Sequence, residues 1–280
     1  MTTGFGTRLA QAMSSRGPLC VGIDPHRALV EAWGLTYDLA GLERFALTCV
    51  EAFAGRVAVV KPQSAFFEVF GSGGIAVLER VLTELREGGT LTILDAKRGD
   101  IGSTMAAYAE ALLGRDAVAP ADAVTVSPFL GYESLRPAID LAAENGRGVF
   151  VLALTSNPEG ATVQHAVRNG RSVAASIVEG ATVDNAFARE RGGLGSVGLV
   201  IGATVGTAVT DLGLDLVTAA TPVLAPGFGA QGATALHLQR TFGSARPQVL
   251  ASSSREILQA GPSVTRLADR AEQVVEQLRG

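Results

Sequence analysis

The chain has 280 residues, of which 47% are hydrophobic and 18% are charged, and its formal net charge is −4. This composition excludes a disordered chain, and the lack of a basic excess argues against nonspecific binding to nucleic acid. The length allows one large domain or two ordinary ones, and no shift in composition marks a boundary between two.

The two cysteines, Cys20 and Cys49, lie far apart and outside any cluster of Cys and His. We therefore expect neither a disulfide framework nor a structural zinc site, and we expect both side chains in the core. Residues 1–16 lack the apolar segment of a signal peptide. The sequence contains no run of 18 apolar residues, which is about the length needed to cross a bilayer. These features predict a cytoplasmic protein that does not associate with a membrane.

Eight short apolar runs recur along the chain, each four to seven residues long and rich in Val, Ile and Leu. Continuous apolar runs of this length are typical of strands that are buried on both faces of a parallel sheet. We expect the strands at residues 19–23, 57–60, 91–94, 123–126, 148–154, 198–201, 222–225 and 248–251.

Segments with helical periodicity separate these runs. Apolar residues recur every three or four positions over residues 42–53, 75–85 and 264–278. Alternating strands and helices predict an α/β protein, and eight such units predict a (β/α)8 TIM barrel that forms a single domain over residues 1–280. A doubly wound open sheet is the alternative, because both folds need buried parallel strands.

The longest connection runs over residues 159–196, between the fifth and sixth predicted strands, and we treat it as an insertion. The Asn169–Gly170 pair inside it is typical of a hairpin turn, and a helix is expected over about residues 172–191. In a barrel this insertion lies beside the mouth of the active site.

In a (β/α)8 barrel, catalytic residues lie at the C-terminal ends of the strands. The polar residues that follow the predicted strands include Asp24, Lys61, Asp95, Lys97, Ser127, Ser156 and Arg255, and the seventh strand leads into the glycine-rich segment 226–232. Together they predict a ring of convergent polar groups at one rim of the barrel.

The segment LDAKRGDIGST at residues 94–104 carries the strongest local signal. Asp95 and Lys97 alternate along one strand, so we expect both side chains on the same face, with Asp100 in the following turn. If Lys61 joins them from the neighbouring strand, two cations alternate with two anions, and this network keeps both lysines protonated.

The glycine-rich turn, which includes Gly229, exposes backbone N–H groups that can approach an anion closely. The guanidinium of Arg255 can hold a phosphate with two hydrogen bonds, and a phosphate site after the seventh and eighth strands is common in barrels. The three histidines lie in predicted loops or on helix surfaces, so we expect neither a histidine-based mechanism nor a bound metal ion.

With these motifs the sequence resembles the orotidine 5′-phosphate decarboxylase family, in its longer bacterial form. The shared motifs are GIDP at 22–25, VKPQ at 60–63, DAKRGDIGST at 95–104, SPFLG at 127–131, TSNP at 155–158, PGFGAQG at 226–232 and SSR at 253–255. They follow the order of the family over residues 22–255, and the insertion is the part that does not align residue by residue.

The resemblance implies a homodimer that converts orotidine 5′-monophosphate to UMP and carbon dioxide, the last step of de novo UMP synthesis, without a metal or cofactor. It implies that Lys97 protonates C6 and that Asp95 crowds the substrate carboxylate, while Lys61 and an Asp100 from the other subunit complete the charged network. The implied substrate contacts are Asp24 and Lys61 to the ribose, Thr104 across the dimer, Ser156 to the pyrimidine, and Gln231 and Arg255 to the phosphate.

Two other functions remain as alternatives. A magnesium-dependent sugar-phosphate decarboxylase or lyase of the same superfamily is expected to carry an acidic metal ligand at the end of the second strand, where this chain has Lys61. A catalytically inactive barrel that acts as a binding protein is expected to have lost at least one of the charged residues. The retained charges argue against both.

Overall fold

Eight parallel strands close into a barrel in the computed structural model, which describes residues 3–229 and 232–279. The strands are β1 (Leu19–Ile23), β2 (Val59–Pro62), β3 (Leu91–Arg98), β4 (Ala123–Val126), β5 (Gly148–Leu154), β8 (Val197–Ile201), β9 (Val223–Pro226) and β10 (Val249–Ser253). Because β1 pairs with both β2 and β10, the sheet has no free edge. The predicted barrel is therefore confirmed, and the open sheet is excluded.

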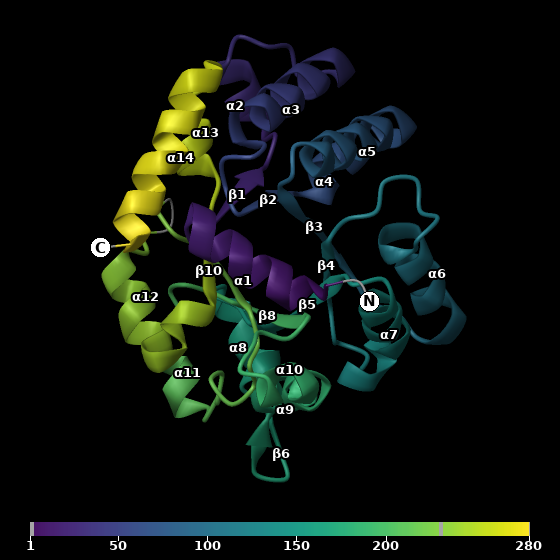
Figure 1. Cartoon of the computed structure of the whole chain (residues 1–280), viewed down its shortest axis with the longest axis vertical. Helices are drawn as coiled ribbons and strands as arrows, with labels where there is room; N and C mark the ends of the chain where they lie inside the picture. The colour runs from purple at the N-terminus through teal and green to yellow at the C-terminus, as the bar shows by residue number, and fades with distance from the viewer. Residues whose placement is uncertain (1–2, 230–231, 280) are drawn as a thin grey trace.

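Helices surround the strands and connect them (Figure 1). The long helices of the outer layer are α3 (Leu39–Phe53), α5 (Gly71–Glu87), α6 (Gly102–Leu113), α7 (Arg136–Glu144), α9 (Val173–Asp184), α12 (Ala235–Phe242) and α14 (Val264–Arg279). Shorter ones are α2 (Arg27–Ala32), α4 (Ser64–Glu68), α10 (Ala186–Glu190), α11 (Ala208–Asp211) and α13 (Arg255–Leu258). The helices predicted from periodicity lie within α3, α5 and α14. Among the described residues, no helix combines the length and apolar character needed to span a membrane.

One helix that the sequence analysis did not predict closes the N-terminal end of the barrel. Helix α1 (Phe5–Arg16) crosses in front of the strands in Figure 1 and buries Phe5, Leu9 and Met13 among the side chains that fill the barrel interior. The Phe5 ring meets Phe150 of β5 edge to face, with centroids 5.9 Å apart. The apolar residues of α1 follow a four-residue spacing, which directs them to the same face of the helix.

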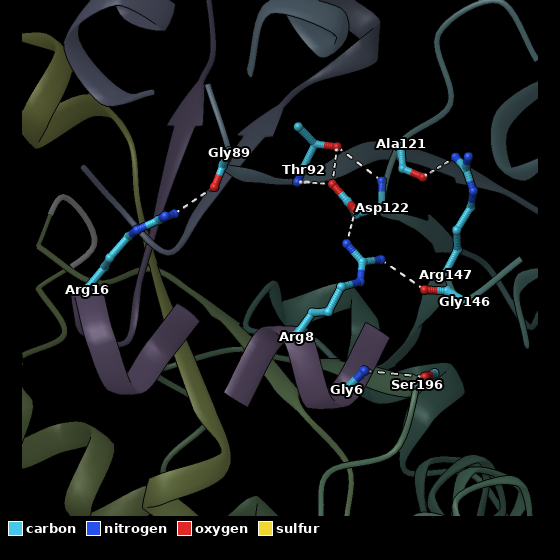
Figure 2. Close-up of polar contacts among 10 residues, drawn as sticks. All are labelled: Gly6, Arg8, Arg16, Gly89, Thr92, Ala121, Asp122, Gly146, Arg147 and Ser196. Atoms are coloured by element: carbon cyan, nitrogen blue, oxygen red, sulfur yellow. Dashed lines mark hydrogen bonds and ion pairs between the residues drawn. The ribbon is translucent and has the colours of Figure 1, made fainter. Parts of the chain in front are cut away.

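Polar contacts hold α1 against the starts of the strands (Figure 2). The guanidinium of Arg8 donates to the Asp122 carboxylate and, at 2.9 Å, to the carbonyl of Gly146. Asp122 in turn accepts from the backbone N–H of Thr92 on β3 at 3.0 Å. The barrel is thereby closed at this end, and its other end remains for a ligand.

The barrel interior also contains Cys20, which is fully buried on β1. Burial raises the pKa of its thiol to about 12, so the thiol stays protonated at neutral pH. The prediction that Cys20 and Cys49 are core residues is confirmed, since both are free and buried.

The connection between β5 and β8 folds into several short elements. These are a 3₁₀ turn at Pro158–Gly160, helix α8 (Ala161–Gln164), a hairpin of β6 (Val167–Arg168) and β7 (Arg171–Ser172), and then α9 and α10. Asn169 and Gly170 occupy the hairpin turn with φ angles of 53° and 77°, as the Asn-Gly pair predicts. The predicted single helix is divided at the buried Asn185, whose amide bonds the backbone of Val197 at the start of β8.

We predict that Phe5→Ala lowers the free energy of unfolding by about 3–5 kcal/mol, because it empties a fully buried aromatic site in the barrel interior. Denaturant unfolding measures the change. The matched control is Phe187→Ala. The Phe187 side chain is 68% exposed, so this substitution should lower the free energy of unfolding by less than about 1 kcal/mol. Equal losses in the two variants would mean that α1 does not stabilise the barrel.

Candidate active site

A cavity of about 390 Å³ opens at the C-terminal ends of the strands. Its wall includes six of the residues predicted from the sequence: Asp24, Lys61, Asp95, Lys97, Ser156 and Arg255. They come from the ends of β1, β2, β3, β5 and β10, so closure of the barrel brings together residues that are up to 231 positions apart in the chain. This is the rim at which barrel enzymes carry out their chemistry.

The carboxylate of Asp95 lies at the centre of the charged residues in this cavity. Its Oδ2 accepts from Lys61 Nζ at 2.8 Å and from Gln63 Nε2 at 3.0 Å. Its Oδ1 accepts from Lys97 Nζ at 2.6 Å and from Thr125 Oγ1 at 2.9 Å. Asp95 is buried, and four donors on two oxygens compensate for the water that burial removes.

The two ammonium groups hold Asp95 in its charged form. Burial alone would raise the pKa of the Asp95 carboxyl, but the charges of Lys61 and Lys97 outweigh it and keep this pKa well below its usual range. For Lys61, burial lowers the pKa, and the charges of Asp24 and Asp95 together raise it above its ordinary value. Asp95 and Lys61 are therefore both ionised at neutral pH.

The two lysines differ in their access to the cavity. The side chain of Lys61 is 7% exposed, whereas that of Lys97 is 45% exposed, although both reach the same carboxylate. Lys97 therefore presents an ammonium group that a ligand can contact directly.

The backbone at Lys97 departs from a regular strand. Lys97 has a φ of 47°, and the register of β3 on β4 shifts between Leu94 and Arg98. The backbone N–H of Lys97 donates to Thr125 Oγ1 at 3.0 Å, and the same hydroxyl donates to Asp95. Asp95 and Lys97 thus meet as the sequence predicts, but through this irregularity instead of the simple alternation that was expected.

Two residues that line the cavity each have a buried oxygen without a hydrogen-bond partner among the described residues. These oxygens are Oδ1 of Asp24 and Oγ of Ser254, which belong to neighbouring strand ends. The close packing of these strand ends needs Gly22, since a Cβ there would lie 2.7 Å from the Cβ of Ser254. Unpartnered buried acceptors of this kind suit a ligand that carries hydroxyl groups.

Arg255 and the turn after β9 form a further part of the wall, next to Ser254. Arg255 begins α13, and its guanidinium makes no hydrogen bond or ion pair within residues 3–229 and 232–279. Gly227 and Phe228 line the cavity; Gly229 lies just beyond, with a φ of 74° and no room for a Cβ, which would lie 1.5 Å from Glu256 Oε2. Gln231, the other residue predicted here, lies outside the described residues.

Besides Ser127 and Gly229, two predicted residues do not line the cavity of their own chain. Asp100 follows β3 and accepts from the backbone N–H of Ile101 at 2.8 Å, and Thr104 is exposed on α6. Large apolar side chains are exposed in the same part of the chain and in the turn after β4, namely Ile101, Phe129 and Leu130.

Several residues of the site were not predicted. Gln63 follows Lys61 by two positions, so strand alternation could have placed both side chains on the same face. Thr125 is the one polar residue in the AVTV run of β4, and its polarity could have marked it as a site residue. His26 lies in a loop, as predicted, but it also lines the cavity and packs on Phe66, with ring centroids 4.3 Å apart. Among the residues described, no three His, Cys, Asp or Glu side chains are grouped so as to hold a metal ion.

Comparisons with known proteins agree over nearly the whole chain. Residues 17–269 match the model of the orotidine 5′-phosphate decarboxylase / HUMPS family. A protein of Streptomyces coelicolor named orotidine 5′-phosphate decarboxylase is 57% identical over 277 residues, which are 98% of this chain and 97% of that protein. A protein of the same name from Salinispora tropica is 56% identical over 276 residues, again 98% of this chain and 97% of its own length.

Solved structures show the same similarity. The crystal structure of a Streptomyces avermitilis protein described as an orotidine 5′-phosphate decarboxylase has a TM-score of 0.94 and 55% identity, and the match covers 99% of this chain and 95% of that one. The Leishmania donovani OMP decarboxylase has a TM-score of 0.75 and 29% identity, with 99% and 98% covered.

We predict that Thr125→Val destabilises the protein by about 1–3 kcal/mol, because it removes the acceptor of the Lys97 N–H and leaves one acceptor position of the buried Asp95 unpaired. Denaturant unfolding gives the stability, and amide hydrogen exchange should become faster at Lys97. Thr210→Val on the exposed face of α11 is the control and should change stability by less than about 0.5 kcal/mol. Unchanged exchange at Lys97 would show that the hydroxyl does not hold this backbone.

Proposed function

This chain belongs to the orotidine 5′-phosphate decarboxylase / HUMPS family, and we propose that it is a carboxy-lyase that converts orotidine 5′-monophosphate to UMP and carbon dioxide in UMP biosynthesis. The observation that carries the proposal is the Lys61–Asp95–Lys97 network at the ligand-accessible end of the barrel. We also propose that it works in the cytoplasm, where its two free cysteines would stay reduced.

Lys97 is the proposed proton donor. When the bond between C6 and the carboxylate breaks, carbon dioxide leaves and the electron pair stays on C6 of the pyrimidine. The ammonium of Lys97 stabilises this charge as it develops and transfers a proton to C6, after which water reprotonates the amine. An interaction that strengthens only as the charge forms lowers the barrier without tightening ground-state binding.

Asp95 and Lys61 prepare the site for this step. Asp95 remains ionised because its neighbouring ammonium groups hold its pKa below the usual range. In the proposed complex its charge faces the substrate carboxylate, and the repulsion is relieved as carbon dioxide leaves. Lys61 is held rigidly by Asp95 and contributes, with Asp24, the polar groups for the ribose hydroxyls.

The remaining contacts supply binding energy away from the reacting carbon. We assign Ser156 to the pyrimidine ring, and Arg255 with the Gly229 turn and Gln231 to the phosphate. A guanidinium with no carboxylate partner among the described residues is suited to a phosphate dianion, because charge-assisted bidentate pairs are the strong ones. Binding energy from the phosphate can then hold the strained complex.

We further propose a homodimer in which Asp100 and Thr104 complete the active site of the partner subunit. Two features support this: neither residue lines the cavity of its own chain, and the exposed Ile101, Phe129 and Leu130 offer apolar surface for an interface. The partner's Asp100 would then add the second anion of the alternating network.

The alternatives from the sequence are not favoured. The end of β2 carries Lys61, paired with Asp95, where a magnesium-dependent relative is expected to have an acidic ligand. An inactive binding protein would not need four donors on one buried carboxylate, and the curated relatives at 56–57% identity bear the name of the decarboxylase.

We predict that the wild-type protein consumes orotidine 5′-monophosphate in the presence of a metal chelator, followed as loss of the orotate absorbance. Lys97→Ala should lower turnover below about 1% of wild type, because loss of a general acid alone costs about 10²- to 10⁴-fold. Circular dichroism should stay near wild type, and Arg168→Ala on the exposed hairpin should keep full activity. Turnover by Lys97→Ala at the wild-type rate would contradict this mechanism.

We predict that the shared site can be restored by mixing two inactive homodimers, Lys97→Ala and Asp100→Ala. In a heterodimer one site receives both defects, and the other combines an intact Lys97 with an intact Asp100 from its neighbour. After equal subunit exchange, activity should return to about one quarter of wild type, since half of the dimers carry one working site of two. If Asp100 acts in its own chain, no activity returns although native mass spectrometry detects heterodimers.

A further inference from the structure

The insertion between β5 and β8 reaches back to the end of β5 through one side chain. Gln164 is the last residue of α8, and its Oε1 accepts a hydrogen bond from the backbone N–H of Thr155 at 2.8 Å. Its Nε2 donates to Thr155 Oγ1 at 2.7 Å. One amide group therefore binds both the main chain and the side chain of the residue that precedes Ser156.

The hydrogen bonds continue on the other side of Ser156. Thr155 Oγ1 donates to Asn157 Oδ1 at 2.6 Å, and Asn157 Nδ2 donates to the carboxylate of Glu159 at 3.1 Å. Both neighbours of Ser156 are thus fixed, while Ser156 itself is exposed on the cavity wall and free to meet a ligand.

Two glycines show how closely this turn is packed. A Cβ at Gly160 would lie 2.8 Å from Thr155 Oγ1 and 3.1 Å from Gln164 Oε1, so the hydrogen-bonded groups leave no room for a side chain. On the β8 side, a Cβ at Gly202 would lie 3.1 Å from both the Cβ and the backbone nitrogen of Ser156. Ser156 is held between the strand that follows the insertion and the polar contacts within the insertion.

We infer that Gln164 is a positioning residue that fixes Ser156 for contact with the pyrimidine ring, so that the insertion takes part in recognition of the base. The inference rests on the proposed function for the identity of the ligand. Arg255 lies on α13, after β10, and Gln164 makes its contacts at the end of β5, so Gln164 should influence binding of the base and leave binding of the phosphate unchanged.

The test is a double-mutant cycle on ligand affinity. Calorimetry measures the affinity for UMP, which carries base and phosphate, and for ribose 5-phosphate, which lacks the base. Gln164→Ala and Ser156→Ala should each weaken UMP binding by about 3- to 10-fold, the range of one neutral hydrogen bond, and leave ribose 5-phosphate binding unchanged. The double variant should bind UMP no more weakly than Ser156→Ala alone, because Gln164 acts through Ser156.

Two further variants separate positioning from general damage. Gln164→Glu keeps the acceptor for the Thr155 N–H and loses the donor to Thr155 Oγ1, so its loss of UMP affinity should be smaller than that of Gln164→Ala. Gln273→Ala on the exposed face of α14 should leave both affinities at wild type. Thermal unfolding confirms that each variant is folded at the temperature of the titration.

Three results would overturn the inference: losses in the two single variants that multiply in the double variant, an equal loss of ribose 5-phosphate affinity in Gln164→Ala, or no effect of Ser156→Ala on UMP. Failure of the proposed function has a different signature, namely that wild-type protein does not consume orotidine 5′-monophosphate. Because the cycle measures binding and not turnover, the two failures are distinguishable.

Discussion

The active end of this barrel depends on one buried carboxylate. Asp95 accepts hydrogen bonds from Lys61 and Gln63 at the end of β2, from Lys97 within the register shift of β3, and from Thr125 of β4. It therefore joins three neighbouring strands and sets the positions of both ammonium groups before any ligand arrives. Charges that are already in place need no reorganisation during the reaction, which is the main source of electrostatic catalysis. Without the carboxylate, two cations would share one site with no counter-charge at that position.

The residues that stabilise the barrel and the residues of the candidate active site lie at opposite ends of the same strands. At the N-terminal end, α1 fills the opening with Phe5, Leu9 and Met13, and Arg8 links it to Asp122 and Gly146. At the C-terminal end, polar atoms such as Asp24 Oδ1 are left without partners among the described residues. This separation is general in barrels, and it allows unsatisfied groups to accumulate at one rim while the other supplies packing.

The strands could be predicted from the sequence because a strand buried on both faces must be apolar along its whole length. Polar residues at their ends then indicated Asp24, Lys61, Asp95 and Arg255, and closure of the barrel brought them together. The backbone at Lys97 could not be predicted, because its positive φ accompanies a hydrogen bond to a hydroxyl of the neighbouring strand, which is distant in the sequence. Helix α1 was missed because its amphipathic pattern is short and its partners are spread over the whole barrel.

The distribution of lysine has a practical consequence. Lys61 and Lys97 are the only two lysines among the 280 residues. The other residues counted as positively charged at neutral pH are all arginines. Lys61 is buried and paired, so Lys97 is the one lysine whose amine is substantially exposed. Reagents that acylate or reductively alkylate side-chain amines will therefore mark the active site and little of the remaining surface. Covalent attachment of this protein to a support or a dye through lysine would block the cavity, and labelling chemistry must be directed to another residue type.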